Sequence, residues 1–342
     1  MKTWIVPQGA TEGSGALKLV DQPSLEPGRG EVKIAVKAWS TNFRDILVAG
    51  GQYFGGPVPE DRIPLSDGAG EIVAVGEGVT VWKLGDRVAG TFFQNWTKGP
   101  ITPDALGTDL GGLIDGMLAE EVILSADGVV RIPDHLTFEE AATLACAGVT
   151  AWSALFEIAK VKPGGSVLTL GTGGVSVFAV QLAVAAGLRV IATSSSDEKL
   201  TRIKELGADE TINYVSTPDW DQEVLRRTHG LGVDAVIETG GAGTLLRSLN
   251  ALRLNGVVAI VGVLSQPDPD ANPILPMIGK AATLQATYVG SRAMFEDLNR
   301  FLEHKQIKPV IHRVFSFEEA PLAYEHQASG RHFGKVVISE NA

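Results

Sequence analysis

The first 128 residues combine short runs of alternating polar and apolar positions with glycine-rich turns. Residues 31–38 alternate with the two-residue period of a half-buried strand, and residues 70–76 and 85–90 read as two further strands. Turn signals such as Pro27-Gly28 separate these runs. The pattern predicts a small barrel-like β domain.

From residue 129 onward, longer apolar runs alternate with helical stretches. Thr137 and Glu140 match a capping box, which predicts that an apolar helix follows over residues 141–156. Six apolar runs bounded by turns predict strands, at residues 166–170, 189–193, 210–213, 233–237, 257–261 and 283–287. Strands that alternate with helices indicate βαβ units, a parallel sheet and therefore an α/β domain.

After residue 290 the elements follow a different order. The pattern predicts a helix at 293–304, a strand near 310–315 and a last strand at 334–338. Ser316 and Glu319 match a second capping box between these strands. This terminal segment therefore departs from the rhythm of the domain before it.

The composition narrows the function classes. Lys and Arg total 29 against 40 Asp and Glu, a net charge of −11, which disfavours nucleic acid and anionic membranes as main partners. The single cysteine, Cys146, excludes an intramolecular disulfide and any zinc site built from four cysteines. The start carries no signal-like apolar core, and no apolar run reaches membrane-spanning length. We therefore expect a cytoplasmic protein whose substrate is a small molecule.

Residues 171–176, Gly-Thr-Gly-Gly-Val-Ser, follow the first predicted strand of the α/β domain and precede an apolar helix. They nearly match the Gly-x-Gly-x-x-Gly fingerprint, in the strand–loop–helix setting that the chemistry requires. The first glycine permits a tight turn, the second lets the backbone approach a pyrophosphate, and the helix N-terminus offers free N–H groups. Ser176 replaces the third glycine. We predict that a dinucleotide binds to Gly171, Thr172, Gly173, Gly174 and Val175.

The end of the second predicted strand bears on which dinucleotide binds. An NAD-preferring site usually carries a carboxylate there, which holds the ribose 2′-hydroxyl. This chain carries hydroxyls and then a cation, in the order Ser194, Ser195, Ser196 and Lys199. We predict that these residues bind a 2′-phosphate and that the cofactor is NADP(H). Ser195 and Glu198 also match a capping box, which is compatible because a cap needs only one serine.

Several short motifs occur together, in the order Pro27-Gly28-x-Gly30-Glu31-Val32, Asn42-Phe43-Arg44-Asp45, Asp67-Gly68-Ala69-Gly70-Glu71-Ile72, Gly85-Asp86-Arg87-Val88, Ala147-Gly148-Val149-Thr150-Ala151-Trp152, the loop at 171–176 and Gly334-Lys335-Val336-Val337. With these motifs the chain resembles the medium-chain dehydrogenases/reductases over essentially its whole length. The resemblance implies an α/β fold in two parts. Residues 1–128 and 291–342 would form a GroES-like, β-rich substrate domain, and residues 129–290 a Rossmann domain with a doubly wound parallel sheet.

Zinc-containing members of that family hold a catalytic zinc with a cysteine, a histidine and a second cysteine. This chain has Asn42, Ser66 and Cys146 at those positions, and Asn and Ser are poor zinc ligands. It therefore resembles the zinc-independent branch, which includes quinone and enoyl reductases, and we expect no metal. The resemblance implies NADPH-dependent hydride transfer to a small quinone, enone, enal or related carbonyl compound. An alcohol dehydrogenase and a non-catalytic NADPH-binding protein are the alternatives.

Without a metal, hydrogen-bond donors and one proton source must assist the reaction. The family pattern suggests three candidates. Tyr53 is a candidate proton donor, unless it only packs on a glycine-rich turn. Asn42 either faces the substrate or caps the helix that follows it. Asp67 either takes part in catalysis or supports the pocket by pairing with Arg44.

Further cofactor contacts follow from the family pattern and from the carboxyl ends of the predicted strands. They are Thr150, Tyr214, Thr239, Gly240, Gly262, Val263, Val289, Gly290, Phe333 and Lys335. The resemblance also implies a homodimer joined through the edge of the Rossmann sheet. Residues 283–289 carry no charge that would protect a strand edge, which suits pairing with a second subunit.

Overall fold

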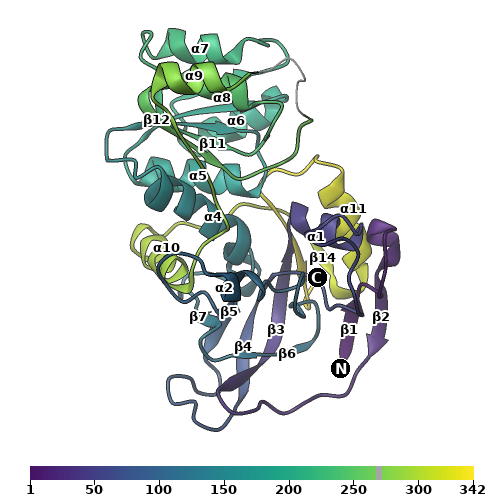
Figure 1. Ribbon diagram of the computed structural model, residues 1–342. Coiled ribbons are helices and arrows are strands. Elements are labelled where there is room, and N and C mark those ends of the chain that lie inside the picture. The colour runs from purple at the N-terminus through teal and green to yellow at the C-terminus, as the bar shows by residue number, and fades with distance from the viewer. Residues whose placement is uncertain (267–271) are drawn as a thin grey trace. The chain divides into compact units, whose positions relative to one another are not determined.

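The structure is a computed structural model that describes residues 1–266 and 272–342. The chain divides into two compact units, Met1–Val149 with Gly290–Ala342, and Thr150–Val289 (Figure 1). The sequence predicted divisions after residues 128 and 290. The first division lies later because residues 129–149 pack with the first unit, where β7 (Val129–Arg131) pairs with β5 (Arg87–Gly90).

The first unit is built on a seven-stranded sheet, shown in Figure 1. Its strands follow the order β14 (Ile311–Ser316), β15 (Lys335–Ser339), β3 (Glu31–Thr41), β4 (Asp67–Val75), β5 and β7, and β6 (Glu121–Ser125) pairs with β3. Only the β14–β15 pair is parallel among these. A separate antiparallel pair joins β1 (Lys2–Ile5) to β2 (Lys18–Asp21). The β-rich domain predicted from both ends of the chain is confirmed.

The long strand β3 aligns segments that are far apart in the sequence. Val336 of β15 lies opposite Thr41, and Asp67 of β4 lies opposite Ser40. The end of β3 therefore meets the starts of β4 and β15. Trp39 of β3 is 1% exposed and belongs to the hydrophobic core of this unit.

The helices of the first unit are short, apart from one. They are α1 (Phe43–Ala49), α2 (Pro103–Leu106), α3 (Phe138–Ala141), α10 (Arg292–Lys305) and α11 (Ala320–Ala328). The predicted capping box opens α3, because Thr137 Oγ1 accepts the Glu140 N–H at 3.2 Å. The predicted helix over residues 141–156 is not continuous: π-helical turns at Leu144–Gly148 and Ser153–Ile158 flank α4 (Val149–Trp152). An almost wholly apolar segment does not distinguish the two hydrogen-bond patterns.

The second unit contains a parallel sheet of six strands. Their order is β10 (Glu210–Asn213), β9 (Arg189–Ser194), β8 (Ser166–Leu170), β11 (Val233–Glu238), β12 (Leu252–Ile260) and β13 (Thr283–Ala286). Numbered along the chain this is the order 3-2-1-4-5-6 of a Rossmann fold, which confirms the predicted fold class. All six predicted strands are present, although β12 begins at Leu252 rather than at residue 257.

Helices connect these strands, as Figure 1 shows. They are α5 (Gly174–Ala185), α6 (Asp197–Glu205), α7 (Trp220–Arg227), α8 (Leu245–Ala251) and α9 (Ile274–Lys280). Leu168, Ile191 and Val236 are fully buried in the core, as expected for a parallel sheet covered by helices. Within residues 1–266 and 272–342, no helix has the length and apolar character that crossing a membrane requires.

Candidate active site

The loop between β8 and α5 has the geometry of a phosphate-binding turn. Gly171 has a φ of 72°, in the left-handed region that glycine adopts without strain. Gly173 is the N-cap of α5, and the N–H of Gly174 has no partner within an α-helix. Ser176 donates from Oγ to the Leu170 carbonyl at 2.6 Å, so it ties the helix to the strand where a third glycine would stand. The loop therefore offers backbone donors to an anion.

The ends of β8, β11 and β12 lie side by side at this edge of the sheet. Thr239 donates from Oγ1 to the Leu170 carbonyl at 2.7 Å. Gly262 donates its N–H to the Glu238 carbonyl at 3.1 Å. A Cβ at Gly262 would lie 1.9 Å from the Thr239 carbonyl oxygen, so this position needs glycine. The structure thus brings together the predicted residues Thr239, Gly240 and Gly262 where open α/β sheets bind ligands.

Glu238 organises this edge, and the sequence did not single it out. Its side chain is fully buried, and Oε1 accepts the N–H groups of Gly240 at 2.7 Å and Gly241 at 2.9 Å. Thr244 Oγ1 donates to the same oxygen at 2.7 Å, and Ser248 Oγ donates to Oε2. The carboxylate thereby fixes the loop that follows β11. One signal in the sequence could have identified Glu238: it is a carboxylate at the end of an apolar strand, shortly before two glycines.

The end of β9 gathers most of the residues predicted to bind the 2′-phosphate. Ser196 is the N-cap of α6, because its Oγ accepts the Lys199 N–H at 3.3 Å. The capping box at Ser195 and Glu198 is therefore wrong by one residue, and Ser195 is exposed. Tyr214 lies beside them, since its N–H donates to the Ser194 carbonyl at 3.0 Å.

The positive charges of Lys199 and Arg202 on α6 repel each other. The pKa of Lys199 is lowered, first because its amine is partly desolvated and second because the Arg202 guanidinium is close. An anion beside both groups would relieve this repulsion. Asp197 is the first carboxylate after the three serines at the end of β9, and it accepts a hydrogen bond from Asn213 Nδ2 at 2.7 Å. The site at the end of β9 is therefore suited to an anionic group.

The remaining predicted cofactor contacts lie in several places. Thr150 and Gly290 stand at the two points where the chain passes from one unit to the other, and both are buried. Val289 has a φ of 46°, which is uncommon for a β-branched residue. Val263 is 73% exposed and Phe333 is 1% exposed. Contact of these residues with a cofactor stays a prediction.

A second polar cluster lies where β3, β4 and β15 meet. Lys335 is 3% exposed, and its Nζ donates to the Thr41 carbonyl at 2.9 Å and to Asn42 Oδ1 at 2.5 Å. The same Nζ lies 3.4 Å from Asp67 Oδ2, while Ser66 Oγ donates to Asp67 Oδ1 at 2.8 Å. All three N–H bonds of Lys335 Nζ point to protein acceptors, and contact of Lys335 with the cofactor stays a prediction.

Asn42 occupies the N-cap of α1, as the capping alternative expected. The Asp45 carboxylate accepts the Asn42 backbone N–H at 2.7 Å. The Asn42 side chain accepts the bond from Lys335 at Oδ1, and its Nδ2 is buried with no hydrogen-bond partner among the described residues. The carboxamide therefore keeps one donor group available.

Tyr53 packs on a buried ion pair that the sequence did not reveal. Arg44 Nη2 donates to Asp109 Oδ2 at 2.5 Å, and the guanidinium carbon lies 4.5 Å from the centre of the Tyr53 ring. Arg44 also donates to Asp45 Oδ1 at 3.2 Å. The predicted ion pair between Arg44 and Asp67 is wrong. The pairing of β15 with β3 places Lys335 next to Asp67 instead.

Burial changes the acidity of this group of side chains. Burial raises the pKa of Tyr53 to about 12, with the Arg44 charge opposing the shift and the Asp109 charge adding to it. Tyr53 is therefore protonated at neutral pH and can donate a hydrogen bond. Burial also raises the pKa of Asp45 to about 6, again against the effect of Arg44.

The residues at the family's catalytic-zinc positions do not fit a zinc ion. Asn42 Oδ1 and the Ser66 hydroxyl already bond to neighbouring side chains. The Cys146 thiol is partly exposed, and it is the one side chain at these positions of a type that zinc binds well. In the part of the chain that the structure describes, no three or more His, Cys, Asp or Glu side chains are grouped to hold a metal.

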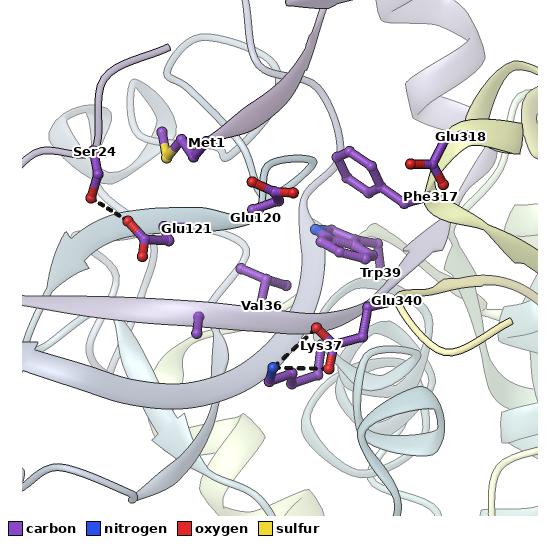
Figure 2. A pocket seen from close by; sticks show the side chains of 11 residues that line it. Met1, Ser24, Val36, Lys37, Trp39, Glu120, Glu121, Phe317, Glu318 and Glu340 are labelled. Carbon is purple, nitrogen blue, oxygen red and sulfur yellow. Dashed lines mark hydrogen bonds and ion pairs between the residues drawn. The ribbon is translucent and has the colours of Figure 1, made fainter. Parts of the chain in front are cut away.

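The first unit has a hollow of about 500 Å³, whose lining residues Figure 2 shows. It is lined by Trp39, Phe317 and four glutamates among others. Lysines compensate its carboxylates: Lys37 lies 2.8 Å from Glu340, and Lys2 lies 3.0 Å from Glu318. None of the predicted site residues lines this hollow.

Known proteins are similar to this chain in sequence and in fold. Residues 28–134 match the family described as alcohol dehydrogenase GroES-like domain, and residues 174–304 match the family described as zinc-binding dehydrogenase. A zinc-type alcohol dehydrogenase-like protein of Schizosaccharomyces pombe is 44% identical over 316 residues, covering 90% of this chain and 90% of that protein. The chain belongs to the medium-chain dehydrogenase/reductase family. It is therefore an oxidoreductase of a family that typically uses NAD(P)(H).

Relatives of this medium-chain dehydrogenase/reductase carry different names. A quinone oxidoreductase of Pseudomonas aeruginosa is 31% identical over 338 residues, covering 95% of this chain and 96% of that protein. A mycobacterial protein whose structure was solved in complex with NADPH shares 29% sequence identity. It has a TM-score of 0.82, with 99% of this chain and 100% of that chain covered. The β8–α5 loop and the strand ends around it fit such a dinucleotide.

Proposed function

We propose that this medium-chain dehydrogenase/reductase is an NADPH-dependent reductase of quinones, enones, enals and related carbonyl compounds, and that it works without zinc. The observation that carries the proposal is the chemistry of the three positions at which zinc-containing members bind their metal. Asn42 and Ser66 are neutral side chains engaged in hydrogen bonds, and Cys146 alone retains a ligand type. An amide and a hydroxyl do not replace a thiolate and an imidazole.

The substrate class follows from this lack of a Lewis acid. In a quinone or an enone the reacting carbon is conjugated to a carbonyl group, so negative charge spreads onto oxygen as hydride adds. A few fixed hydrogen-bond donors can stabilise that charge. An isolated ketone or an alcohol needs stronger polarisation, of the kind that a metal ion provides. The quinone oxidoreductase among the relatives supports this choice.

The cofactor would be held at the carboxyl ends of the parallel strands. Gly173 and Gly174 would receive the pyrophosphate at the N-terminus of α5. Ser196 and Lys199 would receive the 2′-phosphate at the end of β9. NADPH bound there supplies the hydride. The NADPH complex of a relative and the missing carboxylate at the end of β9 both support NADPH over NADH.

The first unit contributes the groups that handle charge and protons. Tyr53 is the proposed proton source, because it carries a hydroxyl on a ring that is held against the Arg44 guanidinium. Asn42 is the proposed donor to the substrate oxygen, since its Nδ2 is otherwise without a partner in the described chain. Asp67 is a positioning residue, because both of its oxygens are bound, one by Ser66 and one by Lys335.

The test is an assay of NADPH oxidation with a quinone, an enone and an aldehyde, repeated with NADH and with a metal chelator. The reverse assay supplies NADP+ and a secondary alcohol. We expect NADPH-dependent turnover of the quinone or the enone that the chelator does not change. Chelator-sensitive alcohol oxidation would overturn the proposal in favour of the alcohol dehydrogenase alternative. NADPH binding without turnover of any acceptor would favour the non-catalytic alternative.

The proton source is tested by Tyr53→Phe, which removes the hydroxyl and keeps the ring. If Tyr53 protonates the product, kcat should fall about tenfold or more. The dissociation constant for NADPH should stay within about twofold, because the strand-end residues are untouched. An unchanged kcat would remove Tyr53 from the mechanism.

A further inference from the structure

Lys335 reaches the candidate site because of the register of two strands. β15 pairs with β3 so that Val336 lies opposite Thr41, which places Lys335 at the level of Asn42, just beyond the end of β3. Gly334 precedes it with a φ of 77°, and a Cβ there would lie 2.4 Å from the Val310 carbonyl oxygen. Only glycine fits this close to the Val310 carbonyl oxygen, so the backbone of the turn into β15 fixes the position of Lys335.

The side chain of Lys335 ends among hydrogen-bond acceptors. Nζ donates to the Thr41 carbonyl oxygen, to Asn42 Oδ1 and to Asp67 Oδ2. An ammonium group has three N–H donors, whereas a neutral amine has two. The side chain is 3% exposed, so water does not compete for these donors. A fixed internal cation therefore lies at the meeting point of β3, β4 and β15.

The ammonium determines how the Asn42 carboxamide is turned. Lys335 Nζ has no acceptor, so the Asn42 atom 2.5 Å from it must be the oxygen. The nitrogen Nδ2 must then point away from Lys335. It is buried, and no acceptor for it exists in residues 1–266 and 272–342. A buried donor without a protein partner can bind an acceptor that a ligand brings.

The cation also stands among the residues that replace the family's zinc ligands. Lys335 bonds directly to Asn42, and it shares Asp67 with Ser66. The two altered ligand positions are thus both linked to this ammonium group, Asn42 directly and Ser66 through Asp67.

We propose that Lys335 is a built-in replacement for the catalytic metal: it holds the Asn42 carboxamide so that Nδ2 donates to the carbonyl oxygen of the substrate, and its charge strengthens that donor. This inference rests on the proposed function. Hydride adds to the carbon conjugated with the carbonyl, the π bond opens, and the electron pair moves to the carbonyl oxygen. That oxygen gains charge while it accepts from Nδ2, and a proton from Tyr53 or water completes the two-electron reduction. NADPH is oxidised to NADP+, and the acceptor is reduced.

Lys335 is thus a positioning residue, and Asn42 is the group that touches the substrate. A cation linked to the donor stabilises the transition state more than the ground state, because the oxygen carries more charge there. The benefit should be larger for an enone than for a quinone, because an enolate oxygen is more basic than a hydroquinone oxygen. A purely structural lysine would affect both acceptors alike.

The test is a double-mutant cycle of Asn42→Ala, Lys335→Met and the two together, assayed with NADPH and with both a quinone and an enone. We expect Asn42→Ala to lower kcat for the enone about 100-fold and Lys335→Met about tenfold or more. The double variant should be no more than about threefold slower than Asn42→Ala, since Lys335 acts through that residue. Independent, multiplying losses would overturn the proposal, and so would equal losses for the two acceptors.

Two controls separate this role from folding. Lys33→Met removes another buried lysine of the same sheet, whose Nζ bonds to Ser24 and Glu26, and it should leave kcat within about twofold. Asp67→Asn combined with Lys335→Met removes both charges, so no lone carboxylate is left buried. If Lys335 is catalytically important, this charge-balanced variant folds and still has low kcat. Recovery of full kcat would overturn the proposal.

A spectroscopic measurement makes the inference testable even if the proposed function fails. In protein with 15N-labelled asparagine, the Asn42 side-chain amide is identified by its loss in Asn42→Ala. We expect its signal to shift or broaden in Lys335→Met, because the carboxamide is released. An unchanged signal would overturn the inference. A wild-type enzyme inactive with every acceptor would instead reject the proposed function, whatever this signal shows.

Discussion

Arg44 of α1 and Asp109 of the loop after α2 form a buried ion pair, with 2.5 Å between Nη2 and Oδ2. Their side chains are 10% and 3% exposed. A Cβ at Gly112 would lie 2.1 Å from Asp109 Oδ2 and 2.3 Å from Arg44 Nη2, so the chain closes over the pair with a glycine. The pair links the helix that follows Asn42 to the loop against which Tyr53 packs.

We predict that Asp109→Asn lowers the free energy of unfolding by about 3 kcal/mol, because the Arg44 charge is left buried with one partner fewer. Denaturant unfolding followed by circular dichroism measures it. The matched control is Asp297→Asn, which breaks the exposed pair with Arg300 and should cost less than about 1 kcal/mol. Similar losses for both variants would contradict the prediction.

Lys199 is expected to distinguish NADPH from NADH. Lys199→Ala should raise the dissociation constant for NADPH about tenfold or more and leave that for NADH nearly unchanged, because a charged hydrogen bond to the 2′-phosphate is lost. Nucleotide fluorescence measures both constants. The control is Lys204→Ala on the same helix, whose Nζ donates to the Asp209 carbonyl. Equal weakening of both nucleotides by Lys199→Ala would speak against a 2′-phosphate site.

Asp45 should make stability depend on pH. Its pKa is about 6 in the folded protein, above the ordinary value of 3.8, so the folded state binds the proton more tightly than the unfolded state. The free energy of unfolding contributed by this group therefore falls as pH rises from about 4 to about 6. Compared with Asp45→Asn, the wild type should lose up to about 2–3 kcal/mol across that window. A difference between the two that does not change with pH would refute this.

We propose that the chain forms a homodimer through β13. This edge strand pairs with β12, and nearby α9 exposes Leu275, which is 71% exposed, and Ile278, which is 67% exposed. Light scattering should give about twice the chain mass of 36.1 kDa, and Leu275→Asp should give the monomer mass. Leu231→Asp, at a residue that is 73% exposed elsewhere in the unit, should stay dimeric. A monomeric wild type would reject the proposal.

Local patterns explain why much of the fold was predictable. All six strands of the parallel sheet were found as apolar runs, since a strand buried on both faces is apolar along its length. The turn at Gly171 and the helix after it were predicted because glycines at this spacing after a strand are typical of a dinucleotide-binding loop. The interrupted helix around Cys146 was not predicted, because apolar residues on all sides hide the change from α to π turns.

The candidate site divides in the same way. Asn42, Tyr53 and Asp67 were identified from motifs, but their partners were not. Asp67 was expected to pair with Arg44, and it pairs with Lys335 instead. Glu238 was missed because a single carboxylate at a strand end does not reveal how many donors will surround it.

By itself, the sequence determined the α/β class, the glycine-rich loop before a helix and the loss of two zinc-ligand types, since each depends on residue identity within a short window. Only the tertiary structure decided which charges meet. Lys335 and Asn42 are 293 positions apart, and Arg44 and Asp109 are 65 apart. Such pairs depend on strand register and loop closure, which follow from the packing of the whole unit rather than from any local pattern.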